Sequence, residues 1–318
     1  MKLKIKYVMA FIAMILTDHS FAGTFSKSSL DSLPKFQLQV DSCVFNFLAD
    51  QQYIFIEGSI GTVKGKFMFD TGSQAALIIN SLFVKLPGGK KIGTGFNGTG
   101  EHYDIMQLDT VRNIVIDGNY TFKAAGPVVA SEEKGIQDGL MPDFLGLIGF
   151  NFFKGYILRL DYLHHKLILY KSSSSFAEHK RYLNGEHVLS VLNFEKRKAP
   201  NHPLINVKID GIPLEAEFDT GQPGTFYPTE STKSRLLLDG VLSPPNDNNE
   251  SKLNAVELAT GLKVDLNYLH VRPHDTGNAM KKSIGITEDD FIGLGYGFLS
   301  KFVTVWDYDN QKIYLLAQ

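Results

Sequence analysis

Hydrophobic and polar positions along this chain follow the pattern of short β-strands. Apolar and aromatic runs of about four residues, such as 53–56, 66–69 and 303–306, are separated by Gly, Asn, Asp and Pro. Two of the separators, 117–118 and 210–211, are Asp-Gly pairs of the kind that close β-hairpins. Few long stretches have the 3.6-residue period of an amphipathic helix. The pattern predicts an all-β fold.

The chain also contains an internal repeat. Residues 149–170 align without a gap on residues 295–316, so that Asp161 corresponds to Asp307. Upstream, a Phe precedes an Asp-Thr-Gly triplet in each copy, at Phe69 and at Phe218. Such self-similarity predicts two copies of one structural unit.

The repeat and the composition together predict the domain boundaries. We expect an N-terminal lobe over 51–170, a polar linker with little to bury over 171–185, and a C-terminal lobe over 186–318. Residues 23–50 form an N-terminal segment that could serve as a propeptide.

Residues 1–22 have the features of a signal peptide. Lys2, Lys4 and Lys6 precede an uncharged apolar run over 7–17, and Ala22 ends a small-residue cleavage site. The run is shorter than the roughly 20 residues that span a bilayer, so no stable membrane span is expected after cleavage. We therefore expect an exported protein, periplasmic or secreted, in a bacterial setting.

Composition and net charge indicate which classes of protein this chain can belong to. The chain is 43% hydrophobic and 12% aromatic, which is enough for a buried core. Its net charge of −2 gives no electrostatic reason to expect nucleic acid or an anionic membrane as a partner. Cys43 is the only cysteine, so no intrachain disulfide forms, and we expect it to be a small buried hydrophobe.

The two Asp-Thr-Gly triplets are the strongest chemical signal. They lie at 70–72 and 219–221, and each is followed, at a nearly equal distance, by an apolar residue and a glycine, at 148–149 and 294–295. Hydrolysis of an amide needs a group that takes a proton from water and a group that gives one to the leaving amine. Two carboxyl groups that share one proton supply both, because they cannot both ionise at about 3 Å. The alternative is that each Asp-Thr-Gly triplet is an ordinary turn between two strands, with no catalytic role.

These motifs resemble those of the aspartic peptidases, which include the pepsins and the retroviral proteases. Each copy is similar to a retropepsin-like unit, and two copies in one chain give the pepsin-like plan. The resemblance implies a two-lobed acid-protease-like β-barrel fold, with one Asp-Thr-Gly loop in each lobe. It also implies that Asp70 and Asp219 are the catalytic pair.

The resemblance further assigns supporting roles around the pair. It implies that Thr71 and Thr220 bond across the lobe junction and that Ser73 bonds to the first carboxylate. Gly72 and Gly221 permit the tight turns. The second copy departs from the family pattern because Gln222 stands where a small hydroxyl residue is usual.

A glycine-rich stretch over 93–100 lies where members of this family have a β-hairpin flap over the cleft. Within this region, Gly95 would suit a mobile hairpin, and Phe96 and Tyr103 are the residues expected to reach over substrate. An ordinary surface loop is the alternative.

The resulting hypothesis is an exported aspartic endopeptidase, monomeric and without a metal or cofactor, that binds an extended peptide by strand-like hydrogen bonds. The apolar composition favours hydrophobic side chains beside the cut bond. Two alternatives remain open. One is a catalytically inactive peptide-binding homologue of the same fold, and the other is an exported β-sandwich interaction module.

Overall fold

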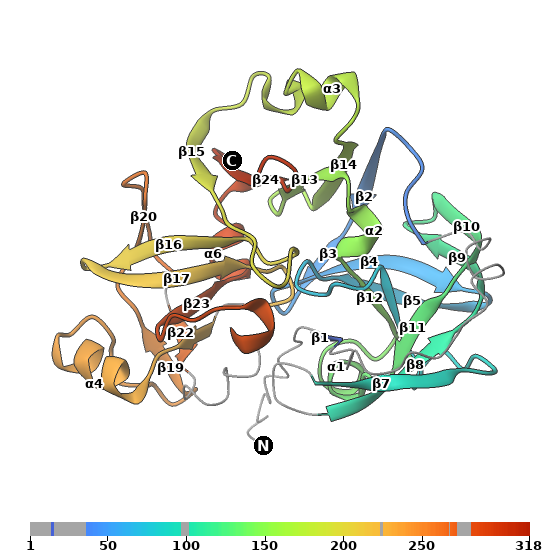
Figure 1. Cartoon of the computed structure of the whole chain (residues 1–318), viewed down its shortest axis with the longest axis horizontal. Coiled ribbons are helices and arrows are strands. Elements are labelled where there is room, and N and C mark those ends of the chain that lie inside the picture. The colour runs from blue at the N-terminus through green and yellow to red at the C-terminus, as the bar shows by residue number, and fades with distance from the viewer. Residues whose placement is uncertain (1–13, 16–35, 97–101, 223–224, 267, 272–280) are drawn as a thin grey trace. The chain divides into compact units, whose positions relative to one another are not determined.

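Strands dominate the computed structural model, which confirms the all-β prediction (Figure 1). The structure describes residues 14–15, 36–96, 102–222, 225–266, 268–271 and 281–318. Contacts divide these residues into two compact units. The first consists of described residues up to Leu38 together with Ile54–Phe153, and the second consists of Gln39–Tyr53 together with Lys154–Gln318.

The first unit is built on one large mixed sheet. In spatial order its strands are β1 (Met14–Ile15), β7 (Lys90–Phe96), β8 (His102–Leu108), β11 (Val128–Ser131), β6 (Leu77–Asn80), β12 (Phe144–Ile148), β5 (Val63–Phe69), β4 (Tyr53–Ile60), β9 (Val111–Ile116) and β10 (Tyr120–Ala125). Two short helices accompany the sheet, α1 (Lys134–Gly139) and α2 (Phe150–Phe153).

The second unit contains two sheets. The eight-stranded sheet has the order β19 (Glu250–Lys252), β22 (Tyr268–Val271), β18 (Thr225–Tyr227), β23 (Phe291–Leu294), β17 (Ile212–Phe218), β16 (Leu204–Ile209), β20 (Val256–Leu258) and β21 (Lys263–Val264). The six-stranded sheet has the order β15 (Val188–Asn193), β25 (Lys312–Leu316), β24 (Val303–Asp307), β13 (Tyr156–Asp161), β14 (Lys166–Lys171) and β2 (Ser42–Asn46).

The remaining elements of the second unit are short. They are β3 (Leu48–Asp50), α3 (Ser175–Glu178), the 3-10 helix η1 (Arg181–Leu183), α4 (Glu230–Leu238) and α6 (Tyr296–Leu299), and residues 281–284 are also helical. Cys43 is buried in β2, as expected, and burial raises the pKa of its thiol to about 12.

Both predicted Asp-Gly turns close β-hairpins. Asp117 and Gly118 connect β9 to β10, and both have positive φ angles, of 49° and 64°. Asp210 and Gly211 connect β16 to β17 in the same way, with 48° and 84°, and these two strands run side by side in Figure 1. A two-residue turn with positive φ at both positions matches the twist of paired strands, which explains why Asp-Gly is used.

The internal repeat of the sequence is a repeat of local structure. In the first unit β5 pairs in parallel with β12, so that Phe69 lies opposite Ile148. In the second unit β17 pairs in parallel with β23, so that Phe218 lies opposite Leu294. An antiparallel neighbour then joins each inner strand, β6 on β12 and β18 on β23. Each Asp-Thr-Gly triplet therefore leaves its sheet at the end of a strand with parallel pairing.

The second half of each repeat is a short helix and a hairpin, α2–β13–β14 and α6–β24–β25. The hairpin turns agree in detail, because Asp161 Oδ1 accepts the His164 amide at 2.9 Å and Asp307 Oδ1 accepts the Asn310 amide at 3.0 Å. The two hairpins pair with each other in the six-stranded sheet, where Leu158 lies opposite Trp306.

This pairing places the first unit's boundary earlier than the lobe expected from sequence. Residues 154–170 belong to the second unit, whereas the sequence grouped them with the lobe over 51–170. The physical reason is that β13 finds hydrogen-bonding partners in the copy of itself from the second repeat. Self-similarity alone does not reveal which copy a strand will pair with.

The expected polar linker over 171–185 is folded. It carries α3 and η1, and Ala177 and Tyr182 are buried in a cluster with Ile157, Val305 and Tyr314. The Ser174 hydroxyl caps α3 by accepting the Ala177 amide at 3.2 Å. Phe176 and Leu183 pack against the same cluster, so four apolar side chains fix a stretch whose composition is otherwise polar.

The N-terminal predictions fall mostly outside the described residues. Nearly all of the expected signal peptide over 1–22 and residues 23–35 of the following segment lie there. The rest of the 23–50 segment is part of the fold, because Phe36 packs on Phe122 and Phe152 while β2 pairs with β14.

Candidate functional site

The first Asp-Thr-Gly triplet forms a tight turn directly after β5. The Asp70 amide donates to the Ile148 carbonyl at 3.0 Å, which ties the turn to the neighbouring parallel strand. The Asp70 carboxylate is buried, and its Oδ1 accepts the amides of Gly72 at 2.8 Å and Ser73 at 3.2 Å. These two bonds hold the carboxylate in one orientation at the end of the strand.

The second triplet repeats this arrangement after β17. Asp219 is buried, and its Oδ1 accepts the Gly221 amide at 2.7 Å. The threonines of the two turns, Thr71 and Thr220, are also fully buried. Each unit therefore builds a carboxylate turn from the same backbone hydrogen bond, from Gly to the Asp two positions earlier.

Phenylalanines anchor both turns in the cores of their units. The Phe69 ring lies 5.2 Å from that of Phe153, and the Phe218 ring lies 5.4 Å from that of Phe298 and 5.9 Å from that of Trp306, centroid to centroid. Burial of one such side chain contributes about 2–3 kcal/mol. The strand ends that carry the two carboxylates are consequently rigid.

A glycine after the inner strand lets each turn pack closely. The Phe150 amide donates to the Ser73 carbonyl at 2.8 Å, and the Tyr296 amide donates to the Gln222 carbonyl at 3.0 Å. A Cβ on Gly149 would lie 2.4 Å from the Ser73 carbonyl oxygen, and one on Gly295 would lie 1.6 Å from the Gln222 carbonyl oxygen. Only glycine fits at either position, which is why the apolar-Gly pair recurs in the sequence.

The residue after each triplet is where the two turns differ. Ser73 contacts Asp70 through its backbone amide, whereas its buried hydroxyl has no hydrogen-bond partner among the described residues. The bond expected from Ser73 to the carboxylate is thus made by the main chain. Gln222 turns its side chain onto Gly293, where a Cβ would lie 2.3 Å from the Gln222 Nε2.

Gln222 belongs to a buried polar network behind the second turn. Its Nε2 donates to Glu217 Oε1 at 2.9 Å, and His202 Nδ1 is hydrogen-bonded to Glu217 Oε2 at 2.7 Å. All three residues are at most 1% exposed. Burial of a carboxylate is tolerated when both oxygens are bonded, so this network supports the strand that ends at Asp219.

Sequence reasoning did not single out Glu217 or His202. The available signal was the position of Glu217, two residues before Asp219 on a strand whose other charged residue is Glu215. Side chains two apart share a strand face, so a carboxylate there faces the same side as the catalytic candidate.

The glycine-rich stretch forms a β-hairpin as far as it is described. Strands β7 and β8 are antiparallel, with Gly95 opposite Tyr103 and Phe96 opposite His102, and residues 97–101 lie outside the described part. The Tyr103 ring covers Gly95, since a Cβ there would lie 2.8 Å from a ring carbon. Burial raises the pKa of Tyr103, and the nearby carboxylates of Glu133 and Asp70 raise this pKa further.

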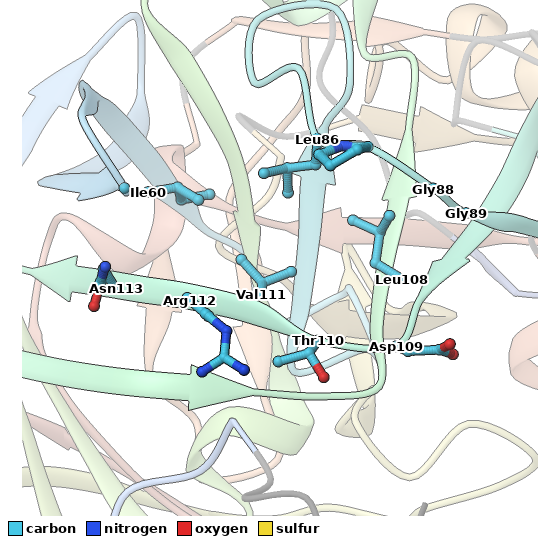
Figure 2. Close-up of a pocket in the computed structure, with 12 residues that line it drawn as sticks. Ile60, Leu86, Gly88, Gly89, Leu108, Asp109, Thr110, Val111, Arg112 and Asn113 are labelled. Carbon is cyan, nitrogen blue, oxygen red and sulfur yellow. The ribbon is translucent and has the colours of Figure 1, made fainter.

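A separate recess lies in the first unit, and none of the residues predicted to act in catalysis lines it. Figure 2 shows its walls, and its volume is about 430 Å³. It is lined by Ile60, Gly61, Leu86, Pro87, Gly88, Gly89, Leu108, Asp109, Thr110, Val111, Arg112 and Asn113. The guanidinium of Arg112 and the amide of Asn113 are at its edge, and the labelled wall is otherwise mixed apolar and polar.

Among the residues that the structure describes, no group of three or more His, Cys, Asp or Glu side chains is arranged to hold a metal ion. None of the helices described here combines the length and the apolar character needed to cross a bilayer.

No protein-family model matches the chain, and no curated protein matches it significantly.

Proposed function

We propose that this chain is an exported aspartic endopeptidase in which Asp70 and Asp219 act as one catalytic pair. The observation that supports the proposal is that both units contain the same local structure around an Asp-Thr-Gly triplet. Each unit ends a strand with parallel pairing in a buried Asp-Thr-Gly turn, held by an amide-to-carboxylate bond and packed against an obligatory glycine.

In the proposed reaction the two carboxyl groups share one proton. The ionised member takes a proton from a water molecule, whose oxygen attacks the carbonyl carbon of the peptide bond, while the protonated member donates to the carbonyl oxygen. Collapse of the tetrahedral intermediate then breaks the C–N bond, with a proton passing from the carboxyl pair to the departing amine. The reaction consumes one water and needs no cofactor or metal.

The other predicted residues take supporting roles in this proposal. Thr71 and Thr220 are the cross-lobe supports, and Gly72 and Gly221 supply the amides that orient the carboxylates. The hairpin of β7 and β8 is the flap, on which Gly95, Phe96 and Tyr103 contact substrate. An extended peptide is bound by strand-like hydrogen bonds.

Cleavage of a mixed peptide library across a range of pH, followed by mass spectrometry, tests the proposal. We expect Asp70→Asn and Asp219→Asn each to reduce cleavage by about 10²–10⁴-fold, the usual contribution of a general acid or base. Asp138→Asn is the matched control, because Asp138 is an exposed carboxylate on α1 that pairs only with Lys134 among described residues. Cleavage near the wild-type rate in either active-site variant would refute the mechanism.

The inactive peptide-binding homologue is favoured by one observation, the Gln222 side chain that bonds to Glu217 in place of a small hydroxyl residue. It predicts that wild type binds library peptides without cleaving them. The interaction-module alternative predicts that the two turns never meet. A chain carrying Asp70→Cys and Asp219→Cys together with Cys43→Ser forms a disulfide under oxidation only if they do meet.

A further inference from the structure

The side chain of Gln222 lies in a slot above a glycine of β23. A Cβ on Gly293 would be 2.3 Å from Gln222 Nε2 and 2.5 Å from its Oε1, and a Cβ on Gly295 would be 3.2 Å from its Cγ. All of these distances are shorter than ordinary van der Waals contact between heavy atoms. Glycine at position 293 is therefore what leaves room for the Gln222 side chain.

Gln222 also closes a ring of the chain around the second triplet. Its Nε2 donates to Glu217 Oε1 at 2.9 Å, so a hydrogen bond joins the residues on either side of 219–221. Inside this ring, Asp219 Oδ1 accepts the Gly221 amide at 2.7 Å. Two residues of chain span at most about 7 Å, so the backbone of Glu217 lies within that distance of the Asp219 backbone. A displacement of Gln222 consequently reaches the Asp219 carboxylate through the turn itself.

His202 holds the other oxygen of the Glu217 side chain. Its Nδ1 lies 2.7 Å from Glu217 Oε2, a length typical of hydrogen bonds between charged groups. The Phe218 amide donates to the carbonyl of Pro203 at 3.2 Å, which keeps the residue next to His202 paired with the end of β17. Three buried side chains, those of His202, Glu217 and Gln222, thus form one chain of hydrogen bonds that ends at the turn.

The first turn has nothing equivalent to this network. Three positions differ together between the copies, since Met68, Leu147 and Ser73 of the first correspond to Glu217, Gly293 and Gln222 of the second. Met68 lies opposite Leu147, and both are buried apolar side chains, whereas Glu217 lies opposite Gly293. The buried Ser73 hydroxyl has no hydrogen-bond partner among the described residues. Gln222 therefore comes with both a partner and the space it needs, which a chance replacement of the small hydroxyl residue would not bring.

We propose that His202, Glu217 and Gln222 are positioning residues that hold Asp219 in its catalytic orientation, and that their network takes the place of the small hydroxyl residue usual after the triplet. The inference rests on the proposed peptidase function and gives the second turn its own means of support. It assigns Gln222 a role in turnover, whereas the inactive-homologue alternative treats the same residue as a loss.

Two substitutions of Gln222 test the network. Gln222→Met keeps the length of the side chain but removes the donor to Glu217. Gln222→Glu keeps the bond only while one of the two neighbouring carboxyl groups is protonated, because two carboxylates about 3 Å apart cannot both ionise. Gln318→Met is the matched control, since it removes a glutamine side-chain bond of 2.8 Å, to the Ser300 carbonyl, elsewhere in the second unit.

The measured quantities are kcat and KM for one peptide that wild type cleaves, over the pH range in which wild type is active. Circular dichroism under the assay conditions gives the folded fraction of each variant, and kcat is expressed per folded molecule. A network that only stabilises the fold would leave this corrected kcat unchanged.

We expect Gln222→Met to lower the corrected kcat by about 10–100-fold and to change KM by less than about threefold, because misplacing a reacting group by about 1 Å slows the reaction without removing contacts to substrate. Gln222→Glu should keep kcat near the wild-type value at the acid end of the pH range. It should approach the value of Gln222→Met at the alkaline end, as the added carboxyl pair loses its shared proton. Gln318→Met should match wild type throughout.

The outcomes separate this inference from the proposed function. If Gln222→Met has the same corrected kcat as Gln318→Met, or if the ratio of kcat between Gln222→Glu and wild type does not change with pH, the inference is overturned and the peptidase function stands. If wild type cleaves no peptide of any composition, the peptidase function is refuted and the positioning role falls with it.

Discussion

Replacing the glycine that follows each inner strand is the sharpest test of how the two turns are built. In Gly149→Ala the new Cβ would lie 2.4 Å from the carbonyl oxygens of both Ser73 and Ala75. Carbon and oxygen cannot approach so closely, and both obstacles are backbone atoms that cannot rotate away. The chain must shift, which strains the turn and weakens the 2.8 Å bond from the Phe150 amide to the Ser73 carbonyl.

The magnitude follows from these two effects. Overpacking of a close-packed site costs about 1–3 kcal/mol, and the weakened hydrogen bond adds about 1 kcal/mol. We therefore expect Gly149→Ala to lower the free energy of unfolding by about 2–4 kcal/mol. The clash in Gly295→Ala is tighter, at 1.6 Å from the Gln222 carbonyl oxygen, so this variant should lose more.

Urea unfolding followed by circular dichroism measures the effect, with Gly93→Ala as the control. Gly93 lies in β7 with nothing within 4 Å of its would-be Cβ, so alanine there should change the unfolding free energy by less than about 0.5 kcal/mol. If Gly149→Ala and Gly93→Ala unfold at the same urea concentration, then the apolar-Gly pair does not support the turn as described.

Two further predictions concern buried ionisable groups of the second unit. His202→Ala removes the imidazole whose Nδ1 lies 2.7 Å from the buried Glu217 side chain and should cost about 3 kcal/mol in the free energy of unfolding; an unchanged urea midpoint would contradict the network. Burial raises the pKa of Glu215 from its ordinary value near 4.5 to about 7, even though the Arg197 guanidinium, 3.7 Å away, opposes the shift. Because the folded state then holds the proton more tightly than the unfolded state, stability should fall as pH rises from about 4.5 through 7, by on the order of 3 kcal/mol. Glu215→Gln should remove this fall in unfolding experiments at several pH values, and an identical pH profile for both proteins would show that Glu215 is not the cause.

The parts of the fold that follow from local chemistry were predictable. Strand-length apolar runs gave the all-β class, and the Asp-Gly pairs at 117–118 and 210–211 marked hairpins, because few other residues adopt two successive positive φ angles. The internal repeat in the sequence identified both Asp-Thr-Gly triplets, and also Gly149 and Gly295, as equivalent positions in the two copies. Their steric role, however, became visible only when the carbonyls of Ser73 and Gln222 were placed against them.

The parts that depend on long-range pairing were not predictable. Nothing in the sequence of β13 indicates that it pairs with β24, so the lobe expected over 51–170 includes residues 154–170, which the contacts place in the second unit. Tyr182 anchors a segment that otherwise reads as a polar linker.

Among the site residues, Glu217 resembles any surface acid in sequence. Its importance comes from burial and from its partner His202, which lies outside any motif. A carboxylate's environment is a property of the folded chain, whereas a triplet motif is a property of the sequence.

The six-stranded sheet limits how far the N-terminus can be trimmed. β2 is the edge strand that covers β14, and its loss would leave the backbone N–H and C=O groups of β14 open to pairing with other chains. The core would also be exposed, because Cys43 and Phe45 of β2 are buried. A maturation protease that acts within 23–50 must therefore cut before Phe36, and a shortened chain that begins after Asp50 would tend to self-associate along that open edge.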